Sequence, residues 1–500
     1  MQKTPNWLLL AGPLLAFGCA SLDARRDVER SAISVEMAVG VPSEKLLLDA
    51  QAAGMATTTL LADGVTADEA VQIALLNNPR VRAALLSVGV SRADIVQSTL
   101  FTNPLLTLSL RLPDGGGLAN FETTLTQNIA ELWLIPARKR AAERDLDRTV
   151  LEAARTAASI ALDARTAYVR ALRAERQRGL AGDALAITER LVEVSLLRQQ
   201  AGTGSEIDVN LARTQRLDAV TSLRNAELVA VESRAELAGL LGLSVDPGSL
   251  VLADTLPDPL AWTVSGEALQ TTARANRLDL QIADRSVEAA AARLQEERVR
   301  FLKSVEVGFA LERGERRPRG DRNLAAETLY DSLQGGQFTP PNLMPRERQG
   351  SDVILGPTFG VEVPLWDQNQ AQIAKADRLL QQATQLRDAW LIETTQDIYA
   401  RLAAARTAAE NAQFYREERL PLAERSAALS REAYRAGHVP FLSVLEAERS
   451  LLTTRSGYVA ALESAALTAV ELERVTGRPA SALRALGQTE RDPGTQPARN

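Results

Sequence analysis

The stretch from Gln368 to Arg435 has the periodicity of one very long helix. At about 1.5 Å per residue, that helix would be roughly 100 Å long, and no compact domain of this size has a core that deep. The alanine-rich face of the stretch instead predicts helices packed side by side at close approach, as in a coiled coil. Its small and apolar residues recur at steps of three and four: Leu379, Ala383, Leu386, Trp390, Ile398, Leu402, Ala405, Ala409 and Ala412.

The same design occurs earlier in the chain, over residues 136–200, where Pro136 is expected to occupy the first helical position. Both long helices end at an Ala-Gly turn, one at Gly202 and the other at Gly437. Each turn is followed by the pattern of a returning helix, and the chain is therefore predicted to be duplicated. The returning helices are expected at about 206–241 and 441–476.

Before each long helix the period of the sequence changes from helical to two, which predicts a pair of strands. A Pro-Asp-Gly-Gly-Gly turn at 113–117 joins the first pair. One face of each strand is apolar and free of charge, whereas the other carries mainly Thr, Ser, Asn, Glu and Gly. The positions on the apolar side are Leu106, Leu108, Leu110 and Leu112; Phe121, Thr123, Leu125, Gln127 and Ile129; Val305, Val307, Phe309 and Leu311; Phe359, Val361, Val363 and Leu365.

Strands of about ten residues have the length needed to cross a bilayer. Four of them cannot close a barrel, because about eight strands is the practical minimum. Since an open sheet edge is not tolerated in lipid, several chains must share one barrel. Three chains would supply twelve strands, and their helices would continue as a second, helical barrel. The alternative is that the two hairpins pack inside a soluble domain.

Two features distinguish the second repeat. A sequence rich in Arg, Gly and Pro separates its strands at about 313–352 and is predicted to be a loop. Pro421 lies within the second long helix, where its missing backbone N–H costs up to about 3 kcal/mol if nothing relieves it. We expect a kink or a local widening of the helix at this point rather than a helix end.

Residues 1–18 have the pattern of a secretory signal, with a short polar start and an apolar run from Trp7 to Phe17. Cys19, the only cysteine, follows where such a signal is cut, which resembles a bacterial lipoprotein signal with an acylated cysteine. Acylation would anchor the chain to lipid. Because Phe17 is bulkier than usual for that pattern, an ordinary signal peptide with an incidental cysteine is the alternative.

Helix signals and composition give the segment boundaries. Thr66 and Glu69 have the spacing of a capping box and open the first repeat. The segment before them is mixed polar and small, and it is expected to pack loosely. The predicted segments are 1–18 as signal, 19–65 as periplasmic lead-in, 66–243 as first repeat, 244–264 as linker, 265–478 as second repeat and 479–500 as disordered tail.

The composition argues against an enzyme. The single histidine, His438, and the single cysteine form no catalytic or metal-binding constellation, and no cofactor is predicted. His438 alone at a turn is expected to be solvated rather than to bind a metal. A net charge of −6 gives no reason to expect nucleic acid as a partner. No apolar run of about 18 residues follows the N-terminus, so no transmembrane helix is predicted.

Over about 66–477 the chain resembles the TolC family of outer-membrane efflux channels. The segments that carry the resemblance are Gly356–Gln370, Ala433–Gly437 and Leu445–Arg449. Within the first, the Trp366–Gln370 part is most similar to the heavy-metal-export (CzcC-like) branch. The resemblance implies a mainly α-helical homotrimer with a 12-stranded β-barrel in outer-membrane lipid, continued by a periplasmic α-helical barrel. It also implies a passive conduit for heavy-metal cations or drugs, docked to a periplasmic adaptor (membrane fusion protein) and an inner-membrane pump of the RND type.

By the same resemblance, the two Ala-Gly turns form a periplasmic tip that contacts the adaptor and closes the pore. Ser443 replaces a frequent Asp, and Val439 stands where some members have a gating Arg, so the closed state is expected to be held differently. Asp208 and Glu446 remain acidic, although both could be ordinary solvated acids at helix starts. The candidate gate or adaptor-contact residues are Asp208, Glu446, Ser443, Tyr434, Gly202 and Gly437.

A lipid-anchored periplasmic coiled-coil adaptor, or a structural spacer without a pore, is the competing function. The apolar faces of the four strands argue against it, because a spacer has no use for them. The sequence also shows no lipoyl-like β-domain of the kind that adaptors carry. The cargo stays open between metal cations and drugs, because a tunnel lined by mixed polar groups selects little.

Overall fold

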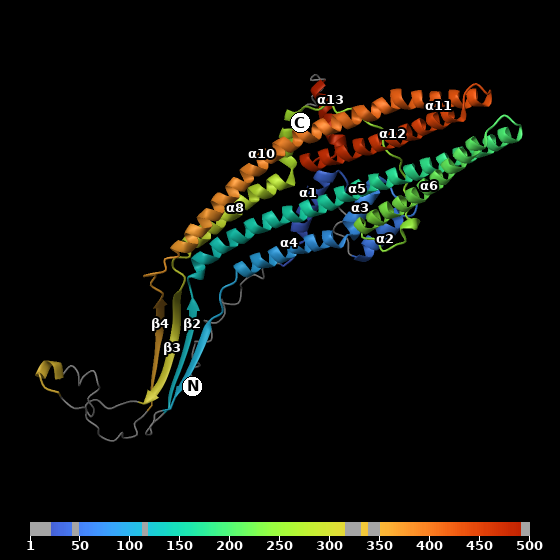
Figure 1. Cartoon of the computed structure of the whole chain (residues 1–500). Coiled ribbons are helices and arrows are strands. Elements are labelled where there is room, and N and C mark those ends of the chain that lie inside the picture. Colours follow the sequence, from blue (N-terminus) through green and yellow to red (C-terminus); the bar gives the residue numbers. More distant parts are fainter. Residues whose placement is uncertain (1–21, 43–49, 113–118, 316–331, 339–350, 492–500) are drawn as a thin grey trace. The chain divides into compact units, whose positions relative to one another are not determined.

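The computed structural model describes residues 22–42, 50–112, 119–315, 332–338 and 351–491 (Figure 1). The predicted signal, Cys19 and the 113–117 turn lie outside the described residues, as does most of the predicted insertion. The chain divides into two compact units. The helical unit comprises Met1–Asp94, Arg144–Ala289 and Gln381–Asn500, and the strand unit comprises Ile95–Glu143 and Ala290–Leu380.

Helices form most of the described structure. The element order α3-α4-β1-β2-α5-α6 recurs as α7-α8-β3-β4-α10-α12, which confirms the predicted duplication. Helices with residues in both units are α4 (Pro79–Ser98), α5 (Glu131–Gln200), α8 (Leu278–Val299) and α10 (Gln370–Phe414). The other helices are α1 (Arg25–Val39), α2 (Ala50–Leu60), α3 (Ala67–Asn77), α6 (Glu206–Leu240), α7 (Gly266–Asn276), α11 (Leu420–Arg435), α12 (Phe441–Thr476) and α13 (Ala480–Arg491).

The second long helix is continuous, as α10, the π-helical segment η5 (Tyr415–Arg419) and α11. The π-helical segment ends two residues before Pro421, where the sequence predicts a kink or a widening. Because a π-helix bonds each N–H to the carbonyl five residues back, the missing N–H of proline is accommodated without ending the helix. Helix α12 leaves space for this segment because it has no side chain at Gly457. A Cβ there would lie 2.7 Å from the Tyr415 hydroxyl oxygen. The expected local widening is confirmed.

The first long helix begins earlier than predicted. Helix α5 starts at Glu131, so the expectation that Pro136 is its first residue is wrong. The start is fixed by Asn128, whose side-chain oxygen accepts a hydrogen bond from Ala130 N–H at 2.9 Å, and by Glu131, which pairs with Arg138. Pro136 then lies in the second turn, where only the hydrogen bond of its own nitrogen is lost.

The returning helices α6 and α12 begin and end within one residue of their predicted bounds. Two capping boxes fix helix starts in the first repeat. In the predicted box, Thr66 accepts from the Glu69 N–H and Glu69 accepts from the Thr66 N–H. Ser205 and Asp208 form a second box at the start of α6. These side chains satisfy N–H groups that a helix start leaves without partners.

Each repeat closes with a glycine that lies against the end of a short helix. Gly242, with φ of +70°, follows α6, and a Cβ there would lie 2.8 Å from the Asn77 carbonyl oxygen at the end of α3. Gly477, with φ of +66°, follows α12, and a Cβ there would lie 2.7 Å from the Asn276 carbonyl oxygen at the end of α7. Glycine is required at both positions by the left-handed backbone and by the close approach.

Replacing Gly242 by alanine is therefore expected to lower the free energy of unfolding by about 2 kcal/mol or more. Gly239 is the matched control, because it lies within helix α6 and a Cβ there meets nothing within 4 Å. Gly239→Ala should raise the unfolding free energy by about 0.5–1 kcal/mol, since alanine has the higher helix propensity. Guanidinium unfolding of both variants measures the difference, and equal midpoints would contradict the account.

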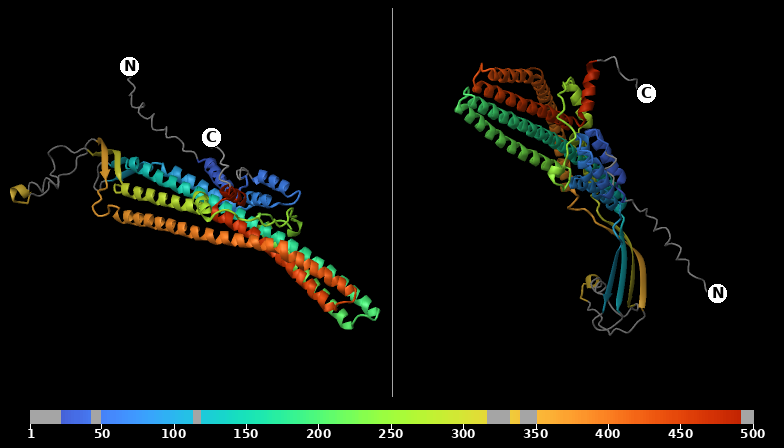
Figure 2. Two further views of the ribbon diagram at one scale, coloured as in Figure 1. Left: turned by 90° about the horizontal axis from the view of Figure 1, so that it is seen from above. Right: turned by 90° about the vertical axis from the view of Figure 1, so that its right-hand side faces the viewer.

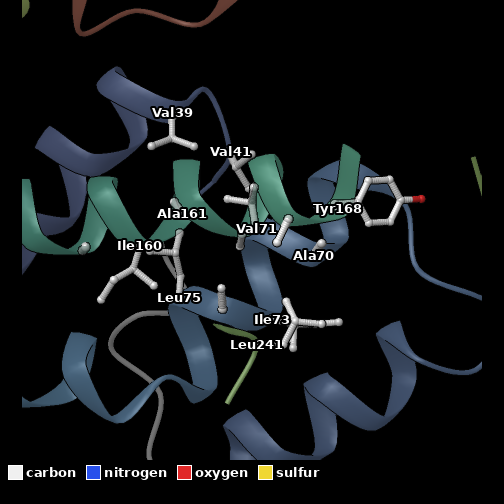
Figure 3. Close-up of a cluster of buried hydrophobic side chains, with 14 of the residues drawn as sticks. Val39, Val41, Ala70, Val71, Ile73, Leu75, Ile160, Ala161, Tyr168 and Leu241 are labelled. Atoms are coloured by element: carbon white, nitrogen blue, oxygen red, sulfur yellow. The ribbon is translucent and has the colours of Figure 1, made fainter. Parts of the chain in front are cut away.

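The main core of the helical unit lies between α1, α3 and α5 (Figure 3). Val71 and Ile73 from α3 and Tyr168 from α5 are completely buried. Helix α1 contributes Val39, which is 1% exposed, and Ser31, whose hydroxyl donates to the Val150 carbonyl at 2.8 Å. The expectation of a loosely packed lead-in over 19–65 is thus wrong, because the apolar face of α1 completes this core.

The expectation of a disordered tail over 479–500 is also wrong for the residues that the structure describes there. Residues 480–491 form helix α13, whose Leu483 is completely buried. The Arg484 guanidinium stacks over the Trp262 ring at 4.8 Å from its centroid. The helix is amphipathic, and its apolar side packs on the segment around Trp262 and Val264.

The strand unit holds one antiparallel sheet in the order β1-β2-β3-β4, formed by β1 (Leu105–Arg111), β2 (Asn120–Asn128), β3 (Val305–Glu315) and β4 (Ser351–Val361). The predicted strand over Phe359 to Leu365 is shifted: β4 ends at Val361, three residues before Pro364, which has no N–H to continue the pairing. Strands β3 and β4 also extend into the predicted 313–352 loop at both of its ends.

Candidate functional site

The two predicted Ala-Gly turns lie side by side in the helical unit, at the ends of the α5–α6 and α11–α12 hairpins (Figures 1 and 2). Both turns are Schellman motifs. Thr203 N–H donates to the Arg198 carbonyl at 2.9 Å, and His438 N–H donates to the Ala433 carbonyl at 2.8 Å. Gly202 and Gly437 have φ of +73° and +79°, and a Cβ added at either position would meet no other atom within 4 Å. Glycine is therefore favoured at both turns by the left-handed backbone conformation alone.

A cluster of buried side chains joins the two hairpins at this tip. It comprises Leu191, Ala212, Tyr434, Phe441, Val444 and Leu445. Tyr434 is 5% exposed and meets the Phe441 ring edge-on at a centroid distance of 5.8 Å. The candidate residue Tyr434 is therefore a packed core residue of the tip within one chain.

Arg198, at the end of α5, binds the end of α11 from across the two hairpins. Its guanidinium lies 4.6 Å from the centroid of the Tyr434 ring. It also donates to the Tyr434 carbonyl oxygen at 2.8 Å. Sequence reasoning missed Arg198, because it looks like any basic residue in the last turn of a helix. Its partner is 236 positions away in the chain.

The acidic candidates are not brought together within one chain. Asp208 is half-buried and belongs to the capping box of α6, and Glu446 is exposed on α12. Among the described residues neither forms an ion pair, and the Asp208 carboxylate accepts a hydrogen bond from the Ser205 N–H at 3.4 Å. Ser443 is half-buried in the first turn of α12, and its N–H donates to the Pro440 carbonyl.

A buried carboxylate lies further along α12. Glu448 is 3% exposed, and Arg431 approaches it at 3.2 Å from α11. Burial raises the pKa of Glu448, while the charges of Arg431 and Arg455 oppose that rise. The sequence singled out Leu445–Arg449 as a motif but gave no sign that this acid, rather than Glu446, turns inward.

His438 is exposed at the second turn. Over the part of the chain that the structure describes, no group of three or more His, Cys, Asp or Glu side chains could hold a metal ion.

The strand register divides the sheet into two unlike faces, because paired residues on neighbouring strands lie on the same face. The apolar face carries Leu106, Leu108, Leu110, Phe121, Leu125, Val307, Phe309, Leu311, Leu355 and Phe359, and the polar face carries Thr107, Ser109, Arg111, Glu122, Thr124, Thr126, Glu306, Gly308, Glu312 and Thr358. Leu105 and Ile354 are large apolar exceptions on the polar face. Thr123, Gln127 and Arg313 are polar exceptions on the apolar face, so the expectation that this face is free of charge is wrong at Arg313.

The edges of this sheet are unpaired. Strands β1 and β4 are its outer strands, and each has one side without a strand partner among the described residues. A long unpaired edge is a template for another strand. No helix in the described residues is both long and apolar enough to cross a membrane.

The Trp366–Gln370 segment forms the turn from β4 into α10. Asp367 accepts from the Asn369 N–H at 2.9 Å and pairs with Lys303 at 2.8 Å. Asn369 has a positive φ of 63°, and its side-chain amide donates to the Glu297 carbonyl at 2.8 Å. The polar residues of this motif therefore stabilise the turn after β4 and bind it to the segments around Glu297 and Lys303.

Solved membrane-protein structures share this fold. A membrane protein from Pseudomonas aeruginosa matches with a TM-score of 0.63 and 16% identity, over 82% of this chain and 93% of that chain. The outer membrane protein VceC from Vibrio cholerae gives 0.61 and 16%, over 83% and 96%. The open state of the MtrE outer membrane channel of Neisseria gonorrhoeae gives 0.60 and 17%, over 82% and 88%.

Residues 269–478, which comprise nearly all of the second repeat, match the family model described as outer membrane efflux protein. The family predicted from the sequence is thereby supported for this part of the chain. No curated protein matches the chain. At these low identities the solved structures establish the fold of the chain, and the CzcC-like branch stays a prediction.

Proposed function

We propose that this chain is the outer-membrane channel of a tripartite efflux system and acts as a passive conduit without catalysis. The single observation that carries the proposal is the four-stranded sheet, which has one apolar face, one polar face and two unpaired edges. An apolar outside and a wet inside are the two faces of a membrane barrel. The family match of residues 269–478 supports the same function.

The unpaired edges support assembly with further copies. Strands β3 and β4 have 11 residues each, the length of a membrane-crossing strand. Because lipid does not tolerate an open edge, β1 of one copy would pair with β4 of the next. Three copies would close a 12-stranded barrel, and their long helices would continue it as a helical tunnel. Two copies would supply only the minimum of about eight strands, and the homotrimer is the assembly that the resemblance to the TolC family favours.

The tip formed by the two hairpins would be the periplasmic end, closed in the resting state and docked to a periplasmic adaptor and an inner-membrane pump of the RND type. Asp208 and Glu446 fit a role in adaptor contact or gating, since both are free of ion pairs among the described residues. Ser443, Tyr434, Gly202 and Gly437 would shape the tip. The pump would select the cargo, heavy-metal cations or drugs, and Cys19 would add a lipid anchor.

The test is the assembly and conductance of the detergent-extracted protein. We expect trimers by native mass measurement and ion conductance in planar bilayers. Leu125→Arg places a charge on the apolar face, at a cost of about 2–4 kcal/mol per copy near the bilayer midplane, and should abolish insertion. Thr124→Arg, on the polar face of the same strand, is the matched control and should insert. Monomers released by high salt, or by trimming the acyl chain, would instead mean that the strands do not insert and would favour the periplasmic spacer without a pore.

A further inference from the structure

A cavity of about 630 Å³ lies in the helical unit, lined mainly by α5, α12, the linker and the start of α13. Both repeats contribute to its lining, with Leu172 from α5 of the first and Ala466 from α12 of the second. The linker adds the stiff residues Pro257 and Pro259. A cavity of this size is typical of sites that bind small molecules.

Part of the lining is apolar and built from small side chains. Helix α12 presents Ala465, Ala466 and Ala469 to the cavity, and α10 adds Ala409. The three alanines on α12 are only half-buried, whereas the adjacent Val470 is buried. Because an alanine side chain ends at Cβ, these positions leave room that a larger residue would fill. This part of the cavity is suited to an apolar group.

The lining also carries an arginine whose polar atoms lack a partner. Arg484 on α13 stacks over the Trp262 ring. Its Nε is buried, and no described residue accepts a hydrogen bond from it. Burial lowers the pKa of Arg484, but an arginine remains charged at neutral pH. A buried donor without an acceptor is rare in proteins and calls for an explanation.

The buried carboxylate nearest in charge to Arg484 is already bound by other groups. One oxygen of Glu473 pairs with Arg165 on α5, and the other accepts from the Ala480 N–H at 2.7 Å. Both oxygens of Glu473 therefore have partners, and its negative charge is matched by that of Arg165. Arg484 is left as a positive charge in excess.

The other acids of the lining do not neutralise Arg484 either. Asp68, Asp254 and Asp258 are all exposed, so water screens their charges. Each also has a partner of its own, since Asp68 binds Arg165 and Asp254 accepts from the Tyr168 hydroxyl. The cavity thus combines one unpaired guanidinium with an apolar surface.

We propose that this cavity binds a small amphiphilic anion, with a carboxylate on Arg484 and an apolar body against the alanines of α12. A guanidinium can hold a carboxylate with two parallel N–H bonds. The bound anion would contact the linker and both repeats, and it would therefore stabilise their packing. The site lies within the helical unit, so the inference goes beyond the proposed function and does not require the strands to enter a membrane.

Calorimetric titration of the full chain in detergent with phenylbutyrate tests the site. We expect binding to the wild type and a loss of affinity of about tenfold or more in Arg484→Gln, because the charged hydrogen bonds are removed. Arg425→Gln is the matched control, since Arg425 is exposed on α11 and lies outside the cavity lining. Phenylbutanol, which has the same apolar body without the charge, should bind about tenfold more weakly or worse.

A second variant tests the apolar part of the site and does not disturb the contact between Arg484 and Trp262. Ala466→Leu fills part of the cavity and should also weaken phenylbutyrate binding. Phenylbutyrate should raise the thermal unfolding midpoint of the wild type and of Arg425→Gln, because a ligand that binds only the folded state stabilises it. If the wild type does not bind phenylbutyrate, or binds phenylbutanol equally well, the anion site is wrong. Unchanged affinity in Ala466→Leu or in folded Arg484→Gln would also overturn it.

Discussion

If the tip closes the pore as proposed, replacing Arg198 by alanine is expected to make the channel conduct in its resting state. Arg198 stacks on the Tyr434 ring and donates to its carbonyl, so it ties the first hairpin of the tip to the second. A charged hydrogen bond and a cation–π contact at a half-buried site together contribute about 2 kcal/mol. Their loss would favour separated hairpins by roughly 30-fold in each copy.

Single-channel recording in planar bilayers, with sensitivity of cells to large antibiotics as a second readout, measures this effect. Arg190→Ala is the matched control, because Arg190 is exposed on the same helix and makes no ion pair within the described residues. Arg198→Lys should be intermediate, since lysine keeps the charge but lacks the planar fork and the stacking surface. Conductance equal to that of the wild type in Arg198→Ala would show that the tip is held closed elsewhere.

Replacing Arg165 by methionine is expected to lower the free energy of unfolding by about 3 kcal/mol. Arg165 on α5 pairs with Glu473 on α12, which is 5% exposed. Without Arg165 the buried carboxylate keeps only its hydrogen bond from the Ala480 N–H, at 2.7 Å. Arg165 also binds Asp68 at 3.0 Å, but the Asp68 side chain is 73% exposed. Asp68→Asn should therefore cost less than about 1 kcal/mol.

The pH dependence identifies the cause. Burial raises the pKa of Glu473, and Arg165 opposes that rise. In Arg165→Met the pKa should rise further. An acid whose pKa is higher in the folded state than in the unfolded state makes the protein less stable as the pH rises from the unfolded-state pKa through the folded-state pKa. The loss of unfolding free energy in Arg165→Met relative to the wild type, measured by guanidinium unfolding, should thus be smaller at pH 5 than at pH 8.

Arg165→Met with Glu473→Gln should recover most of the stability, because glutamine still accepts from Ala480 and carries no charge. A deficit in Arg165→Met that is the same at both pH values, or that persists in the double variant, would argue for lost packing instead.

The sequence predicts the long helices well because their signals are local. Alanine at steps of three and four marks the packed face of each helix, Ser205 with Asp208 caps α6, and Gly437 ends α11 at its predicted turn. Pro421 marked the site of the π-helical segment for the same reason, since a proline acts on its own turn. The alternation of the strands likewise predicted which residues share a face of the sheet.

The sequence predictions are wrong where the structure of a segment depends on residues far away in the chain. Helices α1 and α13 look like polar ends in the sequence, yet their apolar sides complete cores built by other helices. Pro136 has the signature of a helix start, but contacts of Asn128 and Glu131 set the start of α5 one turn earlier. No local pattern carries those contacts.

The sequence by itself determined the duplicated order of elements, the two tip turns and the apolar face of the sheet, because each follows from hydrogen bonding and burial within one segment. Only the tertiary structure decided that Arg198 binds Tyr434, that Arg165 pairs with Glu473 and that Glu448 turns inward. Arg165 and Glu473 are 308 positions apart, so their distance is fixed by how the two repeats pack. An arginine on a helix has the same local signature whether water or a buried carboxylate is its partner.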